Sequence, residues 1–169
     1  MATTSDVLST WNRLRSLPGG RWVFHRLLAR LVPYTGALGA RVVELGGGRA
    51  RVELTDRRRN RNHLGSVHAV ALVNLGEMTS GLALISGLGD DVRSILVRIS
   101  AEYLKKARGT LAATAEIAVP EVTGPVDHIV EAHIRNEAGE VVCRVEAVWR
   151  LDLRPRPAPG HALSGAATR

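Results

Sequence analysis

One long apolar segment sets the limits on how this chain can fold. Between Leu64 and Gly89 most residues are aliphatic or small, and Glu77 is the single carboxylate. Glu77, His68 and Asn74 would be costly in lipid, so the segment predicts a buried helix over residues 67–86 rather than a membrane span. A helix that is apolar on most sides must be covered by other elements.

Strands are expected on both sides of this helix. Residues 40–45 and 49–55 flank Gly46-Gly47-Gly48, and Val52 and Leu54 alternate with polar neighbours, which predicts a hairpin. Four more strands are predicted after the helix, over residues 94–106, 110–119, 126–135 and 141–153. One helix covering one face of an antiparallel sheet indicates the α+β class.

Two short helices are predicted ahead of the sheet, over residues 4–17 and 20–32, with a break at Pro18-Gly19-Gly20. Pro33 is expected to end the second helix, whose amphipathic pattern favours packing on the domain over membrane binding. The length of 169 residues suits one domain. We expect a helical extension over residues 1–35, the folded domain over 36–153, and a disordered tail over 154–169.

The net charge of +7 is concentrated near the N-terminus. The first 61 residues hold 12 of the 23 Lys and Arg residues but only 4 of the 16 Asp and Glu residues. Such a charge suggests an anionic partner. Aromatic residues make up only 4%, which argues against a base-stacking surface for nucleic acid. The densest part, residues 57–61, is either a solvated loop or a contact for phosphates.

Other classes of protein find little support in the sequence. A single cysteine, Cys143, excludes an intramolecular disulfide and a cysteine-based zinc cluster. Asp127 and His133 share one face of a predicted strand while His128 points the other way, so no zinc site is expected. No secretory signal is recognisable, and a cytoplasmic location is expected.

Two features of the apolar segment point to chemistry. Glu77 is either a functional carboxylate or a glutamate that reaches solvent or an arginine. The loop before the helix offers backbone N–H groups at the positive end of the helix dipole, where a carbonyl oxygen can be polarised. Ser66 is the expected N-cap of this helix, and His68 is either structural or catalytic.

These residues carry a resemblance to a known family. The pattern N-x-x-G-x-x-H-G-G-x-x-x-x-x-x-D/E of hotdog-fold acyl-CoA thioesterases, in the PaaI-like group and its DUF4442-type branch, resembles the spacing of Asn62, Gly65, His68 and Glu77. Residues 103–107 also resemble the family segment Y-x-x-P-A, with Lys106 in place of proline. The resemblance covers roughly residues 36–152. It implies an antiparallel sheet wrapped around one long central helix, and a homodimer or homotetramer.

The resemblance also implies a role for each matching residue. Glu77 would attack the thioester carbonyl or activate a water, and Asn62 would position the water or the thioester. The Ala69 N–H would bind the oxyanion, and His68 would brace the loop. Further substrate contacts are expected from Gly65, Ser66, Val70, Gly81, Arg58, Arg59 and Arg61. The substrate would be acyl-CoA, with no cofactor beyond the coenzyme A it carries, no nucleic acid and no membrane.

The sequence departs from the family pattern beside the expected oxyanion site. The family's H-G-G is His68-Ala69-Val70 here, so a methyl group and a branched side chain stand where the family has none. Two functions therefore stay open, hydrolysis of an acyl thioester and binding of one without turnover. A hydratase acting on acyl thioesters is a third, but no well-placed Asp–His pair supports it.

Overall fold

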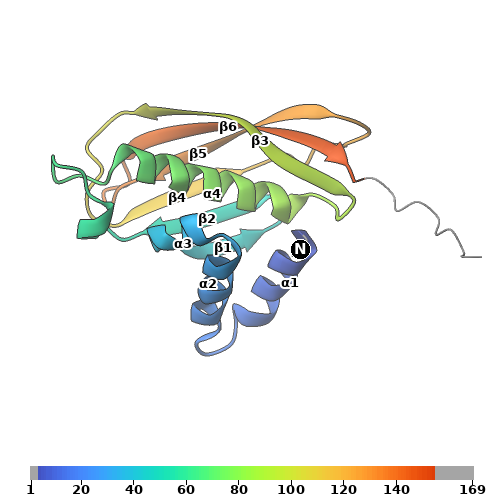
Figure 1. Cartoon of the computed structure of the whole chain (residues 1–169), viewed down its shortest axis with the longest axis horizontal. Coiled ribbons are helices and arrows are strands. Elements are labelled where there is room, and N and C mark those ends of the chain that lie inside the picture. The colour runs from blue at the N-terminus through green and yellow to red at the C-terminus, as the bar shows by residue number, and fades with distance from the viewer. Residues whose placement is uncertain (1–3, 155–169) are drawn as a thin grey trace, which may run out of the picture.

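A six-stranded antiparallel sheet curves around one long helix in the computed structural model, which describes residues 4–154 (Figure 1). The helix is α4 (Ala69–Gly87), close to the predicted range of 67–86. The strands are β1 (Arg41–Gly46), β2 (Arg49–Leu54), β3 (Val92–Tyr103), β4 (Leu111–Glu116), β5 (Val126–Arg135) and β6 (Val141–Leu153). Their order across the sheet is β1-β2-β4-β5-β6-β3, and the predicted α+β hotdog fold is confirmed.

The glycine hairpin forms as predicted between β1 and β2. Gly47 and Gly48 have backbone φ angles of 60° and 78°, which residues other than glycine rarely adopt. A Cβ at Gly48 would also lie 3.0 Å from the carbonyl oxygen of Ile117. Both observations make this a tight turn rather than a phosphate-binding loop.

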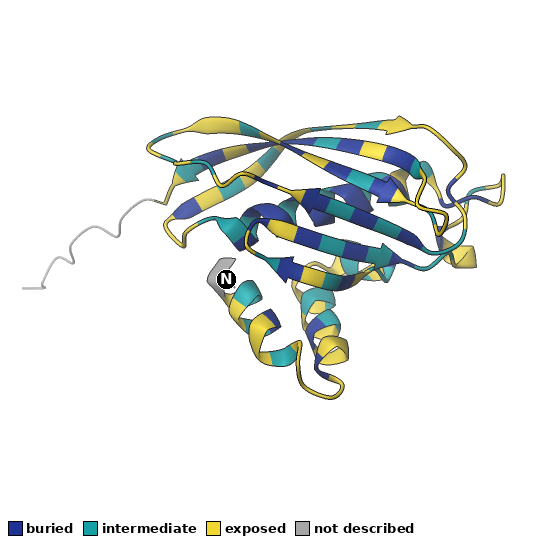
Figure 2. Ribbon diagram, turned by 180° about the vertical axis from the view of Figure 1, so that it is seen from behind, coloured by how far each residue is buried: buried dark blue, intermediate teal, exposed yellow. Residues whose placement is uncertain are grey.

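The sheet buries α4 along one side. Leu75 and Leu84 are fully buried, and a Cβ at Gly76 would lie 2.5 Å from the side chain of Val145. By length and composition α4 is the one helix among the described residues that could cross a membrane. In this fold its buried residues are instead part of the core, and buried residues alternate with more exposed ones along the strands (Figure 2).

Three helices precede the sheet; the first and third contact α4, while the second packs against these two helices and β1 (Figure 1). They are α1 (Thr4–Leu14), α2 (Gly20–Leu31) and α3 (Pro33–Leu38). Trp11 of α1 and Phe24 of α2 join the first two through an edge-to-face contact with ring centroids 5.1 Å apart. The prediction that Pro33 ends the second helix is confirmed, because α2 ends at Leu31, but Pro33 also begins α3, a helix that was not predicted.

The domain boundaries stay predictions. The helix α3 runs across the boundary expected at residues 35 and 36. The tail expected over residues 154–169 lies, apart from Arg154, outside the described residues.

Strand β3 forms one edge of the sheet, because it pairs only with β6. A bulge between Leu96 and Arg98 interrupts this pairing, and Ile95 and Val97 are exposed, at 65% and 45% of their surface. An exposed edge strand with apolar side chains is a surface suited to pairing with another chain.

Candidate active site

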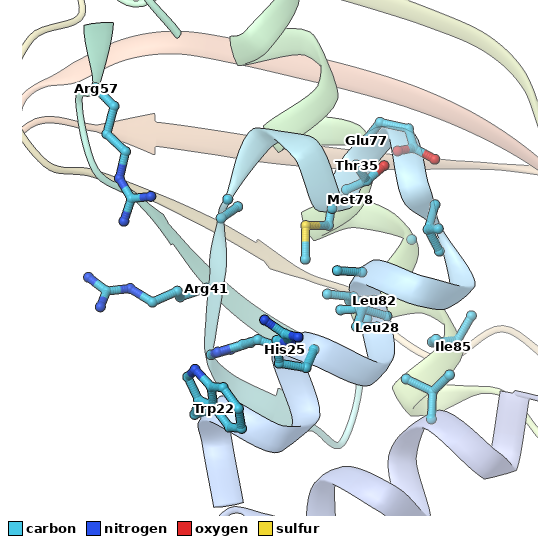
Figure 3. Close-up of a pocket in the computed structure, with 18 of the residues that line it drawn as sticks. Trp22, His25, Leu28, Thr35, Arg41, Arg57, Glu77, Met78, Leu82 and Ile85 are labelled. Carbon is cyan, nitrogen blue, oxygen red and sulfur yellow. The ribbon is translucent and has the colours of Figure 1, made fainter. Parts of the chain in front are cut away.

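A cavity of about 570 Å³ lies between α4 and the α2–α3 segment (Figure 3). Most of its wall is apolar, and it is contributed by Leu28, Ala29, Val32, Met78, Leu82 and Ile85. Charged groups lie at its edges. A mainly apolar cavity with a few polar groups is the usual form of a small-molecule site.

Glu77 projects from α4 at the wall of this cavity, on the same side as Thr35 of α3 (Figure 3). The residue is half-buried, and burial raises the pKa of its carboxyl group. Within residues 4–154 the carboxylate has no ion pair and no hydrogen bond. It is therefore not a glutamate neutralised by an arginine, and it is available to take a proton from a ligand or a water.

A short chain of hydrogen bonds fixes the turn of α4 that carries Glu77. The Ser80 hydroxyl donates to the backbone carbonyl of Glu77 at 3.0 Å, and the Trp149 indole N–H donates to the Ser80 hydroxyl at 3.3 Å. Gly81 makes room for that indole, because a Cβ there would lie 3.0 Å from the Trp149 ring. Gly81 lines the cavity and also packs against the sheet.

Asn74 is a polar residue of this helix that does not line the cavity but lies one turn from Glu77. It precedes Glu77 by three residues, so the two side chains share one face of α4. Its amide oxygen is buried and finds no hydrogen-bond partner among the described residues. Buried acceptors of this kind are rare, and a bound water or ligand is a common reason for them. An asparagine within an apolar helix was the signal in the sequence.

The loop before α4 is closed by its own hydrogen bonds. The side-chain oxygen of Asn62 accepts the backbone N–H groups of Leu64 at 2.9 Å and Ser66 at 3.2 Å. Gly65 allows this turn with a φ of 68°. Asn62, Gly65 and Ser66 are not among the residues that line the cavity, and their contact with substrate stays a prediction.

The N-terminus of α4 differs from the prediction in its capping residue. The N-cap is His68 and not Ser66, which is buried two residues earlier. The Nδ1 of His68 accepts the Val70 N–H at 3.1 Å, so that donor is already occupied. The Ala69 N–H makes no hydrogen bond to any described group and keeps the freedom that an oxyanion donor requires.

Ala69 and Glu77 of one chain are too far apart to act on the same carbonyl group. Eight residues separate them on α4, which is about 12 Å along the helix axis. Reacting groups must come within about 3–3.5 Å of each other. Neither Ala69 nor the neighbouring His68 and Val70 line the cavity that holds Glu77.

Of the predicted arginines, the structure brings only Arg59 to the cavity. Arg61 instead donates to the carboxylate of Asp56 at 2.7 Å, and Arg58 is exposed outside the cavity. Arg41 and Arg57 also line the cavity, and of these two only Arg57 was included in a prediction, as part of the possible phosphate contact over residues 57–61. Arg57 belongs to the arginine run that the sequence singled out, whereas Arg41 had no sequence signal.

Helix α2 is the largest contribution that the sequence reasoning missed. Trp22 and His25 project from it into the cavity wall (Figure 3). The Nε2 of His25 accepts the Val42 N–H at 2.9 Å, which ties α2 to β1. Burial lowers the pKa of His25, and the charges of Arg41 and Arg21 lower it further, although the hydrogen bond with the Val42 backbone opposes this shift.

Among the described residues, no three His, Cys, Asp or Glu side chains are grouped in a way that could hold a metal ion. Asp127 accepts two hydrogen bonds from Arg150, at 2.8 and 3.0 Å. His133 faces Glu131, with 3.7 Å between nitrogen and oxygen.

A known protein family matches most of this chain. The family model described as a domain of unknown function (DUF4442) matches residues 20–151, which includes α2 and α3. A search of curated proteins returned no match.

Solved structures share the fold. A crystal structure from a genomics project is 26% identical with a TM-score of 0.76, covering 89% of this chain and 99% of its own. A Pseudomonas aeruginosa protein named a probable thioesterase is 22% identical with a TM-score of 0.71, covering 82% and 97%. A thioesterase family protein from Silicibacter pomeroyi is 21% identical with a TM-score of 0.66, covering 77% and 96%.

Proposed function

This chain belongs to the DUF4442 family of hotdog-fold proteins, and we propose that it hydrolyses acyl thioesters, with acyl-CoA as the substrate and Glu77 as the catalytic carboxylate. The observation that carries the proposal is the Glu77 carboxyl group, which lies half-buried and unpaired at the wall of an apolar cavity. Structural neighbours named as thioesterases support the same class of reaction.

Hydrolysis of a thioester needs a general base or nucleophile, and a hydrogen-bond donor for the oxyanion that forms on the carbonyl oxygen. As a general base, the Glu77 carboxylate removes a proton from a water molecule while the water oxygen bonds to the thioester carbonyl carbon. The tetrahedral intermediate then breaks its C–S bond, and the proton held by Glu77 passes to the leaving sulfur. A pKa raised by burial favours this exchange, because the carboxylate holds the proton more firmly than an exposed one. Direct attack by the carboxylate on the carbonyl is the other route open to the same residue.

The oxyanion donor is proposed to come from a second copy of the chain. Ala69 of the same chain lies about 12 Å along α4 from Glu77, so it cannot serve the same carbonyl. The exposed edge strand β3, with Ile95 and Val97, offers a surface for a homodimer. In this arrangement Glu77 of one chain and the free Ala69 N–H of the other face one substrate, and Asn62 and His68 hold the loop that presents the N–H. We also propose that such dimers can assemble into a homotetramer. The proposed location of the protein is the cytoplasm.

Binding without turnover is the second candidate function. One observation favours it: His68 already occupies the Val70 N–H, which removes one backbone donor from the helix start. The methyl group of Ala69 and the Val70 side chain also stand where the family pattern has glycines. A protein of this kind would hold an acyl thioester in the cavity as a sensor.

Thiol release from acyl-CoAs of different chain lengths separates the two functions. We expect turnover by the native protein and a loss of about a hundredfold or more in kcat for Glu77→Gln. Glu121→Gln, an exposed glutamate outside the cavity, is the matched control and should behave like the native protein. Binding of acyl-CoA without thiol release would favour the sensor. Equal turnover by Glu77→Gln would remove Glu77 from the catalytic role.

A further inference from the structure

We propose that Arg41, Arg57 and Arg59 form a phosphate-binding mouth to the cavity, which recognises the phosphate groups of a phosphopantetheine-linked thioester. The three residues come from the start of β1, from the residue before a short 3₁₀ turn (Arg58–Asn60), and from that turn itself. All three line the cavity that holds Glu77. The inference rests on the proposed thioester hydrolysis and names the part of the substrate that is recognised away from the thioester.

The guanidinium groups converge on one side of the cavity. Those of Arg57 and Arg59 both lie against Gly39, since a Cβ there would be 2.3 Å from Arg59 Nη2 and 3.7 Å from Arg57 Nη1. Arg41 and Arg57 extend toward the same open side, away from Glu77 (Figure 3). Gly39, with its φ of 74°, also ends α3, so the absence of a side chain there gives the arginines their space.

The backbone that carries these arginines is anchored. The side-chain amide of Asn60, a buried residue at the end of the 3₁₀ turn, donates to the Leu38 carbonyl of α3 at 3.1 Å. The Asn60 carbonyl accepts the His68 N–H at 2.7 Å, which links the turn to the start of α4. A fixed turn lowers the ordering cost of binding.

The charge at this mouth is not neutralised by the protein. Within residues 4–154 the guanidinium groups of Arg57 and Arg59 make no ion pair and no hydrogen bond, and Arg41 contacts only the Thr55 hydroxyl, at 3.5 Å. By contrast, the neighbouring Arg61 is paired with Asp56. Among the residues that line the cavity, Glu77 is the single carboxylate, and it lies on the opposite side.

The composition of the cavity selects among anionic ligands. Three unpaired guanidinium groups match the several negative charges of phosphates better than the single charge of a fatty acid. The apolar wall between the arginines and Glu77, with Leu28, Met78 and Leu82, suits an uncharged chain. A thioester with phosphates at one end and a reactive carbonyl group farther along satisfies both requirements.

The test compares binding and turnover in matched double variants. Arg57→Ala/Arg59→Ala removes two arginines of the mouth, and Arg13→Ala/Arg15→Ala removes two exposed arginines that do not line the cavity. Calorimetry measures binding of coenzyme A and of decanoate to each protein. Thiol release is measured with decanoyl-CoA, with decanoyl-pantetheine, which has no phosphate, and with decanoyl carrier protein, which has one.

We expect the mouth variant to bind coenzyme A at least about tenfold more weakly than the native protein and the control variant. Its KM for decanoyl-CoA or decanoyl carrier protein should rise by a similar factor, with unchanged turnover of decanoyl-pantetheine. The phosphate-bearing substrate that shows the larger change identifies the source of the phosphate.

Two results would overturn the phosphate assignment. One is equal binding of coenzyme A by both double variants, and the other is an arginine-dependent loss of decanoate binding alone. If no thioester is hydrolysed but coenzyme A binding still depends on Arg57 and Arg59, the proposed hydrolysis fails while the phosphate-binding mouth stands.

Discussion

The Nδ1 of His68 accepts a hydrogen bond from the backbone N–H of Val70, at 3.1 Å, and thereby caps the helix that carries Glu77. An N-cap satisfies one of the backbone donors that a helix start leaves without a partner. A histidine seldom has this role, and here it also removes one N–H group from the candidate oxyanion site.

Replacing His68 tests the cap. We expect His68→Ala to lower the free energy of unfolding by about 1 kcal/mol, since the Val70 N–H loses its acceptor. His68→Asn should keep most of the stability, because asparagine is a good N-cap residue. Urea denaturation of the three proteins measures the difference. Equal losses in both variants would show that the imidazole acts through packing rather than through the cap.

Glu77→Gln should stabilise the fold at neutral pH. Because burial raises the pKa of Glu77, the folded state binds this proton more tightly than the unfolded chain does. The resulting stability is complete below the unfolded carboxyl pKa, about 4.3, and is lost as the pH rises through the raised folded pKa. Glutamine is neutral throughout, so its advantage over glutamate should grow with pH. Urea denaturation of both proteins from about pH 4 to about pH 8 gives the difference, and a difference independent of pH would contradict the burial effect.

The binding of acyl-CoA should weaken with salt. Exposed charges are screened beyond about 10 Å at 0.1 M salt, so the KM for acyl-CoA should rise as ionic strength increases. The KM for acyl-pantetheine should stay constant, and Arg57→Ala/Arg59→Ala should flatten the dependence for acyl-CoA. The same salt slope for both substrates would place the electrostatic contact elsewhere.

A larger side chain on α2 should shorten the acyl group that the protein accepts. Leu28 lines the cavity, so Leu28→Trp is expected to reduce kcat/KM for long acyl chains by about tenfold or more while short chains are still hydrolysed. Leu27→Trp is the matched control, because Leu27 is the exposed neighbour on the same helix and does not line the cavity. Steady-state rates over a series of chain lengths measure the effect. A uniform loss at every length would indicate that the cavity does not hold the acyl group.

Gly76 should tolerate no side chain. A Cβ there would lie 2.5 Å from Val145, so Gly76→Ala is expected to cost about 1–3 kcal/mol of stability through overpacking between α4 and β6. Adding Val145→Ala should recover part of that loss. Gly124→Ala, in open space on the surface, should change little. Thermal unfolding of the four proteins measures each step, and the absence of any recovery would mean that the clash lies elsewhere.

Much of the fold could be predicted because its signals are local. The glycine hairpin and α4 follow from short patterns that neighbouring residues set among themselves. Pro33 was correctly expected to end the second helix, but α3 was missed because proline is also compatible with the first turn of another helix. Glu77 was recognisable as the single carboxylate in an apolar helix.

The rest of the site depends on tertiary structure. Trp22 and Arg41 line the same cavity as Glu77 because α2 is fixed to β1 through His25. No spacing in the sequence records that contact. The sequence of the arginine run also does not show which of its members reach the cavity. Arg57 and Arg59 line it and Arg58 does not, because the 3₁₀ turn directs these side chains to different sides.

In this fold, the residues proposed to carry out the chemistry are different from most of the residues that set the size of the cavity. The proposed chemistry resides on α4 and its preceding loop, whereas the size of the compartment is set largely by a segment that ends at Leu38, before the first strand begins. A substitution in that segment can change which molecules enter without moving the carboxylate. An exchange of these helices between relatives is therefore a direct route to engineered selectivity.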